Sequence, residues 1–261
     1  MRSLAVVLTM LVVTPPLGTL AMIAAALGVR DRPGSVFWWV PHAWARSVLW
    51  AAGVRVRVHE AERMGDGTAP AIFVSNHVSW FDVFTLAATL PRAGFLSKAQ
   101  ILRIPVFGPG ARALGSIPIE RDNRKSAFAS IEMAAQRIRA GASVVIFPEG
   151  TRGHDYALRP FKKGPFVMAI AAGAPIIPVI VHGTLPIMPK GTWAVRPGVV
   201  DMHFLEPVRT DGLTYEDRGA LAQRVHDRMS EALVALYGVA SDPPAVAPAA
   251  PSAALTFAPH G

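Results

Sequence analysis

Residues 71–82 read AIFVSNHVSWFD, an apolar run followed by a polar turn and the start of a second apolar pattern. The run AIFVS has the length and composition of a buried strand. Residues 143–147 (SVVIF) and 176–181 (IIPVIV) form similar runs. Helical patterns lie between these runs, and alternating strands and helices are typical of a sheet covered by helices. The sequence therefore predicts an α/β fold with a mixed, mostly parallel sheet flanked by helices.

Four further patterns extend this prediction along the chain. Valines alternate with arginines and a histidine over residues 54–59 (VRVRVH), which indicates a half-buried strand. Residues 124–140 carry apolar side chains at helical spacing, with Asn123 placed to cap the start of the helix. Residues 199–205 predict an edge strand. A capping-box pattern at residues 214–217 opens a last helix.

Composition narrows the classes of partner. The 261-residue chain is 51% hydrophobic and 17% charged, which favours contact with lipid. Its formal net charge of +8 favours an anionic partner: nucleic acid, an anionic membrane or a phosphorylated substrate. Nucleic acid is poorly supported, because no nucleic-acid-binding motif accompanies the charge. Without cysteine, disulfides, thiolate metal ligands and a cysteine nucleophile are excluded.

The N-terminus is unusually apolar. Residues 3–29 contain no charged side chain and are long enough for a transmembrane helix. Pro15 and Pro16 are expected to break this helix, which leaves a kinked span and a re-entrant helical pair both open. Residues 36–53 form a second apolar stretch with four tryptophans, a residue that favours the membrane interface.

These patterns divide the chain into three parts. We expect N-terminal membrane-anchoring helices over residues 1–53, a globular domain over residues 54–240 and a disordered Ala- and Pro-rich tail over residues 241–261. A secretory signal peptide is the alternative reading of the first stretch. The tryptophan-rich second stretch favours an anchor that is retained.

The turn NHVSWFD places His77 five residues before Asp82, at the end of a predicted strand. Ligands of open α/β sheets bind beyond such strand ends. A neutral histidine can accept a proton from a hydroxyl, and an aspartate can fix its tautomer. This requires His77 in the loop and Asp82 in the first helical turn, with Ser79 as N-cap. The alternative is that Asp82 merely completes a capping box and His77 is an ordinary loop residue.

Three other blocks carry charged residues beside predicted strands or helices. They are residues 115–121 (GSIPIER), 147–152 (FPEGTR) and 161–164 (FKKG). Arginine binds phosphate in a bidentate manner, so these blocks suit a phosphorylated head group. A surface Glu-Arg pair and solvated lysines are the alternative meanings. Lys98 follows another short apolar run, and the same two interpretations, a phosphate ligand and a solvated charge, apply to it.

In this order and spacing, the blocks NHVSWFD, GSIPIER, FPEGTR with FKKG, and APIIPVIVHG (residues 174–183) resemble the glycerolipid acyltransferase family. That family includes bacterial 1-acylglycerol-3-phosphate acyltransferases. The resemblance implies that His77 is the catalytic base and Asp82 its partner. It further implies that Arg121, Glu149 and Arg152 shape the site of the lysophospholipid phosphate. Gly150 and Thr151 belong to the same block with less certain roles, and Lys98 and Lys162 would help to gather the phosphates of both substrates.

The implied reaction moves an acyl group from acyl-CoA or acyl carrier protein to the sn-2 hydroxyl of 1-acyl-sn-glycerol-3-phosphate, giving phosphatidic acid. It needs no metal and no cofactor beyond that co-substrate, and the implied location is the cytoplasmic face of the inner membrane. A different acceptor, such as a lyso-ornithine lipid, is the nearest alternative. Hydrolysis by a serine nucleophile is disfavoured because the sequence has no Gly-x-Ser-x-Gly elbow. Hydrolysis by a bound metal is disfavoured because no third metal ligand is evident. A non-catalytic membrane adaptor is the third possibility.

Overall fold

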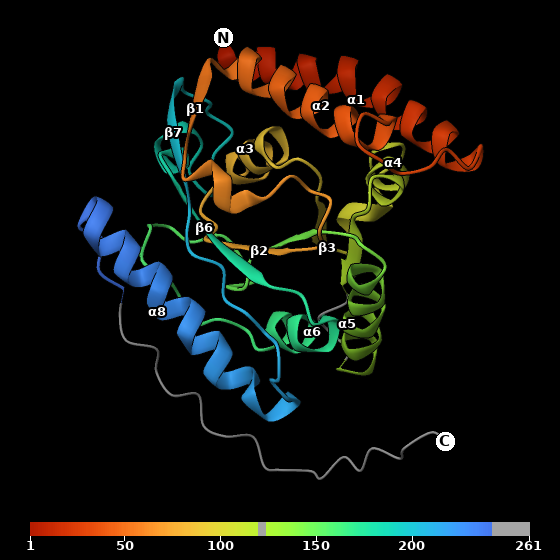
Figure 1. The fold of residues 1–261 in the computed structure, drawn as a ribbon. Helices are drawn as coiled ribbons and strands as arrows, with labels where there is room; N and C mark the ends of the chain where they lie inside the picture. Colours follow the sequence, from red (N-terminus) through yellow and green to blue (C-terminus); the bar gives the residue numbers. More distant parts are fainter. Residues whose placement is uncertain (120–123, 242–261) are drawn as a thin grey trace.

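The computed structural model describes residues 1–119 and 124–241. In this part of the chain, strands form one seven-stranded sheet in the order β1-β7-β6-β2-β5-β3-β4 (Figure 1). Their bounds are β1 Val54–His59, β2 Ile72–Ser75, β3 Gly94–Lys98, β4 Ile117–Ile119, β5 Val144–Ile146, β6 Ile176–His182 and β7 Gly198–Phe204. The three apolar runs of the sequence form β2, β5 and β6, which lie side by side in the middle of the sheet.

Neighbouring strands are parallel except for β6 and β7, which are antiparallel. This confirms the predicted mixed, mostly parallel sheet. The prediction of an edge strand at residues 199–205 is wrong, because β7 lies between β1 and β6. Strand β1 takes the edge and pairs with β7 from Val54 opposite Gly198 to His59 opposite His203. Its alternating charged residues suit an edge position.

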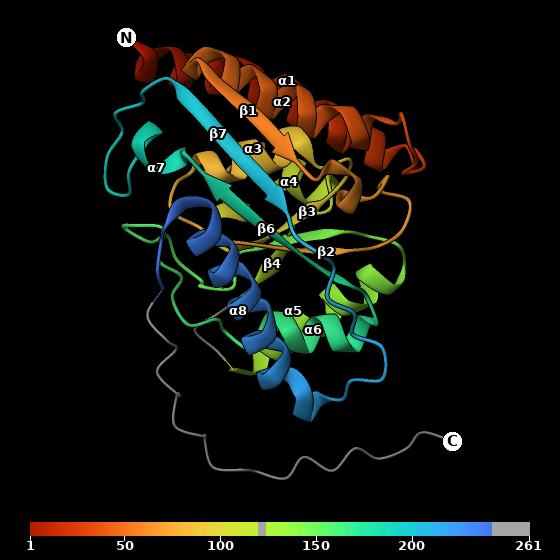
Figure 2. The same ribbon diagram turned by 60° about the vertical axis from the view of Figure 1, so that its left-hand side comes forward.

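Helices cover both faces of this sheet (Figures 1 and 2). The α-helices are α1 Arg2–Ala26, α2 Val36–Ala52, α3 Phe81–Thr89, α4 Phe107–Ala113, α5 Arg124–Arg139, α6 Gly164–Ala172, α7 Thr184–Ile187 and α8 Arg218–Tyr237. Short 3-10 helices are η1 Ala61–Met64, η2 Ile101–Arg103 and η3 Tyr215–Asp217. Helices α2 and α3 lie over one face with α1 outside them, and α5, α6 and α8 cover the other.

Strand β2 joins the two apolar cores that result. Phe73 belongs to the core under α2 and α3, whereas Ile72 and Val74 belong to the core shared with α5, α6 and α8. Successive side chains of a strand point to opposite faces of the sheet. Because both faces are covered, β2 reads as a continuous apolar run.

Helix α1 is continuous through Pro15 and Pro16, so the predicted break is wrong. Both prolines lie on the exposed side of α1, and the opposite side packs against α2 and α4. Close to the prolines, the indole N–H of Trp44 in α2 donates a hydrogen bond to Thr14 Oγ1 at 3.0 Å. Tertiary packing therefore holds the helix straight enough to continue where two N–H donors are missing.

The outer surface of the N-terminal helices is apolar. Within the described residues, α1 is the one helix long and apolar enough to cross a membrane. Its exposed side chains include Leu4, Leu8, Leu11 and Val12. Trp50, near the end of α2, is 83% exposed. A large exposed apolar surface of this kind marks a site of contact with a membrane or with another protein.

Two local signals at helix ends are also tested by the structure. The capping box is confirmed: the backbone N–H of Thr214 donates to Asp217 Oδ2 at 2.7 Å, and η3 leads into α8. The helix expected over residues 124–140 is confirmed as α5. Its expected cap, Asn123, and residues 242–261 of the tail lie outside the described residues.

Candidate active site

His77 follows the carboxyl end of β2, in the centre of the sheet. The preceding residue ties this turn to β6, because the Asn76 amide donates to the Val181 carbonyl at 2.9 Å and accepts from the Val181 N–H at 2.8 Å. His77 lies in the loop and Asp82 in the first turn of α3, as their spacing predicts. Helix α3 begins at Phe81 with Trp80 directly before it, one residue later than predicted. Ser79 nevertheless makes the expected capping contacts: its N–H donates to Asp82 Oδ2 at 2.8 Å, and its hydroxyl oxygen accepts the Phe81 N–H at 3.2 Å.

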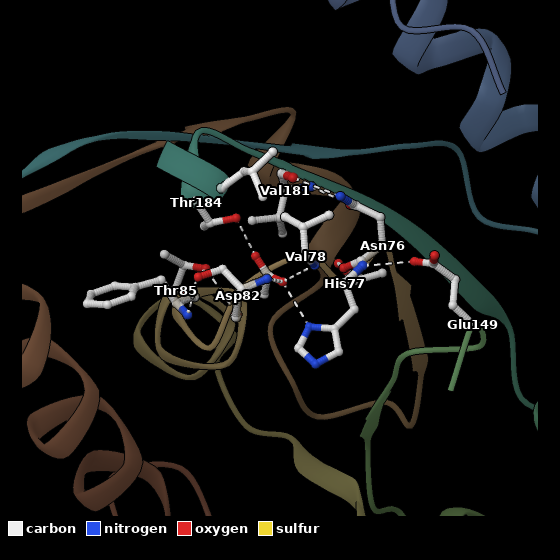
Figure 3. Close-up of polar contacts among 12 residues, drawn as sticks. Asn76, His77, Val78, Asp82, Thr85, Glu149, Val181 and Thr184 are labelled. Carbon is white, nitrogen blue, oxygen red and sulfur yellow. Dashed lines mark hydrogen bonds and ion pairs between the residues drawn. The ribbon is translucent and has the colours of Figure 1, made fainter. Parts of the chain in front are cut away.

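The imidazole and the carboxylate form a direct pair (Figure 3). His77 Nδ1 lies 2.8 Å from Asp82 Oδ2. The same oxygen accepts the backbone N–H groups of Val78 at 2.7 Å and Ser79 at 2.8 Å. Asp82 is fully buried, whereas the His77 side chain is 14% exposed. An ionised carboxylate only accepts hydrogen bonds, so Nδ1 carries a hydrogen, and in the neutral form of the ring Nε2 has the lone pair.

Three contacts fix the position of the histidine itself. Its ring stacks on Phe147 with centroids 3.9 Å apart and an interplanar angle of 16°. Its backbone N–H donates to Glu149 Oε1 at 3.0 Å, and its carbonyl accepts the Gly153 N–H at 2.7 Å. Residues of the FPEGTR block therefore hold the histidine of the NHVSWFD block.

Glu149 is placed differently from the expectation that it shapes a phosphate site. Its side chain is 2% exposed, and its second oxygen accepts the Arg159 Nε–H at 2.9 Å. Burial raises the pKa of Glu149, and the nearby Arg159 charge opposes that rise. The carboxylate supports the His77 backbone and does not line the cavity described next. Arg159 was missed by sequence reasoning, because no motif marks it.

A cavity of about 300 Å³ opens beside His77. Most of its wall is apolar and comes from the N-terminal helices, β3 and α4, including Leu17, Val40, Trp44, Phe95, Phe107 and Leu114. Helices α1 and α2 are thus part of the site as well as of the apolar outer surface. A pocket of this size and lining suits a chain-like apolar ligand.

Polar and charged residues line the same cavity. They include four of the predicted binding residues, Lys98, Gly150, Thr151 and Arg152, together with Lys190. Arg152 also lies over the Trp80 ring, 5.2 Å from its centroid. Lys190 was missed because the loop after α7 has no recognisable motif. Nothing in the local pattern of that loop places it beside His77.

Besides Glu149, one other described residue of the predicted binding set does not line this cavity. Lys162 is exposed and does not line it, and its backbone N–H donates to the Pro148 carbonyl at 3.0 Å. Arg121 lies outside the described residues. Within the described part of the chain, no three His, Cys, Asp or Glu side chains gather in a way that could hold a metal ion.

Comparison with known proteins gives the family. The sequence profile described as Acyltransferase matches residues 55–182, from β1 to the end of β6. A 1-acyl-sn-glycerol-3-phosphate acyltransferase of Haemophilus influenzae is 34% identical over 168 residues, which cover 64% of this chain and 69% of that protein. The chain belongs to the acyltransferase family. His77, Asp82 and the FPEGTR block all lie within the part of the chain that the profile matches.

The chloroplast relatives are longer than this chain. A chloroplastic 1-acyl-sn-glycerol-3-phosphate acyltransferase of Brassica napus is 34% identical over 169 residues, or 63% of this chain and 49% of that protein. The chain thus spans about half the length of the chloroplast relatives it matches. The crystal structure of the 1-acyl-sn-glycerophosphate acyltransferase from Thermotoga maritima has the same fold. That likeness has a TM-score of 0.75 at 22% identity and covers 91% of this chain and 97% of the other.

Proposed function

We propose that this acyltransferase moves a fatty acyl group from acyl-CoA or acyl carrier protein to the sn-2 hydroxyl of 1-acyl-sn-glycerol-3-phosphate. The product is phosphatidic acid, a precursor in phospholipid biosynthesis. One observation carries the proposal: the His77–Asp82 pair stands at an apolar cavity that also has cationic side chains in its wall. Matches to proteins with this named activity support the choice of acceptor.

The reaction is a direct transfer. Nε2 of His77 accepts the proton of the acceptor hydroxyl while the oxygen attacks the thioester carbonyl, so that a C–O bond forms. Asp82 stabilises the resulting imidazolium through Nδ1. The tetrahedral intermediate collapses, the C–S bond breaks, and the thiolate takes the proton from His77. No acyl-enzyme is needed, and the chain has no cysteine to form one by the thiol route.

The charges in the cavity wall suit the acceptor phosphate. Arg152, Lys98 and Lys190 line the cavity that His77 enters, and arginine can bind phosphate through two parallel hydrogen bonds. The resemblance adds Arg121 to this set. A zwitterionic acceptor, such as a lyso-ornithine lipid, has no net negative charge and brings a cation of its own, so it matches these cationic side chains less well than a phosphate monoester does.

The apolar part of the cavity suits the acyl chain, and the N-terminal helices suit a membrane. We propose that α1 and α2 attach the protein to the inner membrane with the catalytic domain on its cytoplasmic face. The exposed apolar side of α1 and the exposed Trp50 support this attachment. The acceptor lipid and the cavity would then lie at the same surface.

The test offers the purified full-length protein a panel of lysolipids with labelled acyl-CoA or acyl carrier protein. The panel contains 1-acyl-sn-glycerol-3-phosphate, a lyso-ornithine lipid and a zwitterionic lysophospholipid. We expect transfer to the phosphate acceptor and a loss of about 10²–10⁴-fold for His77→Ala. His154→Ala, which removes an exposed histidine that does not line the cavity, is the matched control and should be active. Preference for a different acceptor, or full activity of His77→Ala, would contradict the proposal.

A second arm tests the phosphate site. Arg152→Ala and Lys190→Ala should raise the KM for the phosphate acceptor, because each removes a cation that lines the cavity. Lys162→Ala removes an exposed cation that does not line it and should leave KM unchanged. If all three changes raised KM equally, the cause would be the overall positive charge of the protein and not binding of the phosphate at the cavity.

A further inference from the structure

The second carboxylate oxygen of Asp82 has a partner from a distant part of the chain. Oδ2 accepts the His77 Nδ1–H and two backbone N–H groups, whereas Oδ1 accepts the hydroxyl of Thr184, 102 residues further on (Figure 3). Thr184 is the first residue of α7. Both Asp82 and Thr184 are fully buried.

We propose that Thr184 is a positioning residue of the acyl transfer, one that holds the Asp82 carboxylate in the orientation His77 needs. This inference rests on the proposed function. Rotation of the carboxylate about its Cβ–Cγ bond moves both oxygens together. The Thr184 hydroxyl at Oδ1 therefore opposes the same rotation as the three donors at Oδ2, and it anchors the carboxylate from a second, distant segment of the chain.

Chemistry explains why the residue is a hydroxyl donor. An ionised carboxylate accepts hydrogen bonds only, and a buried oxygen without a donor disfavours the charged form. Asp82 must stay charged to stabilise the imidazolium that forms on His77. The Thr184 hydroxyl supplies that donor to the second oxygen of the buried carboxylate.

Tyr156 in turn holds Thr184. Its hydroxyl oxygen accepts the backbone N–H groups of both neighbours of Thr184, Gly183 at 2.7 Å and Leu185 at 2.9 Å. Gly183 has φ +98°, and a Cβ there would lie 2.2 Å from the Val199 carbonyl oxygen, so the turn permits glycine only. Tyr156 and Gly183 thus define the backbone from which the Thr184 hydroxyl reaches Asp82.

The test compares variants that differ in this one hydroxyl. Thr184→Val keeps the shape and removes the donor, and Thr184→Ser keeps the donor. Thr210→Val is the matched control, since Thr210 is also buried and its hydroxyl donates only to the Ala174 carbonyl, at 3.1 Å. The readouts are kcat and KM with 1-acyl-sn-glycerol-3-phosphate and labelled acyl-CoA, and thermal unfolding of each variant.

We expect Thr184→Val to lower kcat by about 10- to 100-fold with KM changed less than about twofold, as for loss of a hydrogen bond to a charged group. Thr184→Ser should recover most of kcat, and Thr210→Val should keep it. A merely structural role would lower the unfolding temperature of both valine variants and spare kcat in the folded protein. Wild-type kcat in folded Thr184→Val, or equal loss in Thr184→Ser, would overturn the inference.

A second pair of variants covers the case in which Thr184→Val fails to fold. Thr184→Ala and Tyr156→Phe leave no buried clash, and each should lower kcat by about threefold or more. Wild-type kcat in both would overturn the inference. The proposed function is tested separately: acyl transfer by the wild type and its loss in His77→Ala would support it for any result with the Thr184 variants. A wild type that acylates no lysolipid would overturn both.

Discussion

The Phe147 ring lies on the His77 imidazole, with the two ring centroids 3.9 Å apart. The stack limits rotation of the imidazole on the side that Asp82 does not hold. We predict that Phe147→Ala lowers kcat by about 10- to 100-fold, because small misplacements of a catalytic group are costly. Steady-state kinetics would measure this. Phe147→Tyr keeps the ring and should retain activity, and an equal loss in both variants would contradict a stacking role.

Glu149 supports the His77 backbone, so its loss should alter turnover more than substrate affinity. In Glu149→Gln the amide NH₂ group cannot accept the Arg159 N–H. We predict a loss of about 1–3 kcal/mol in unfolding free energy and a lower kcat, with KM for the phosphate acceptor little changed. Chemical denaturation and kinetics test both parts. A raised KM with normal kcat would restore Glu149 to the phosphate site.

Helices α1 and α4 touch at two glycines. A Cβ at Gly110 would lie 2.9 Å from Gly18 Cα, closer than packed atoms approach. Alanine normally stabilises a helix relative to glycine by about 1 kcal/mol, but Gly110→Ala should destabilise by about 1–3 kcal/mol through overpacking. Thermal unfolding in detergent would measure the change.

A helical glycine without this contact is the control. At Gly219 in α8, the nearest atom to an added Cβ is Lys163 Cε at 3.9 Å. Gly219→Ala should therefore be neutral or stabilising by up to about 1 kcal/mol. If both alanine variants moved the unfolding temperature in the same direction, close packing of α1 on α4 would not be the cause.

His203 predicts how stability depends on pH. Burial lowers its pKa below the ordinary value of 6.5, and the nearby His59 lowers it further. At a pH above 6.5 both folded and unfolded states leave the ring neutral. Below pH 6.5 the unfolded state binds the proton before the folded state does. The unfolding free energy therefore decreases as the pH is lowered from 6.5 to the pKa of the folded state, by about 1.4 kcal/mol for each pH unit in that interval.

The measurement is the unfolding temperature between about pH 7.5 and pH 5. His203→Gln keeps a polar side chain beside Tyr237, whose hydroxyl lies 2.7 Å from His203 Nε2, but cannot titrate. The variant should lose less stability on acidification than the wild type. His154→Gln, which changes an exposed histidine, should follow the wild type. The same slope in His203→Gln and the wild type would refute this account.

Local patterns predicted the parts of the fold that local physics decides. The run AIFVS became a strand buried on both faces, and the Thr214–Asp217 box became a helix start. The approach of His77 to Asp82 also followed from short-range spacing, since both lie in one turn. Such features depend on neighbouring residues, which the sequence displays directly.

Features that depend on distant contacts could not be predicted in this way. The continuity of α1 past Pro15 depends on packing against α2 and α4, and the interior place of β7 depends on its pairing with β1. Glu149 was assigned to the substrate site because the sequence does not show its hydrogen bond to the His77 backbone, 72 residues away along the chain. Lys190 and Thr184 reach the site from a segment without a motif.

Thr14 and Gly18 line the cavity from a helix whose other side carries exposed leucines. Helix α1 therefore separates this cavity from the medium around the protein, whether that medium is detergent or a bilayer. Detergent and bilayer lipid pack differently against the outer side of α1, so replacing one by the other changes the lateral force on this wall of the cavity. Chain-length selectivity measured in micelles should then differ from selectivity in liposomes of graded thickness, with no change of sequence at all.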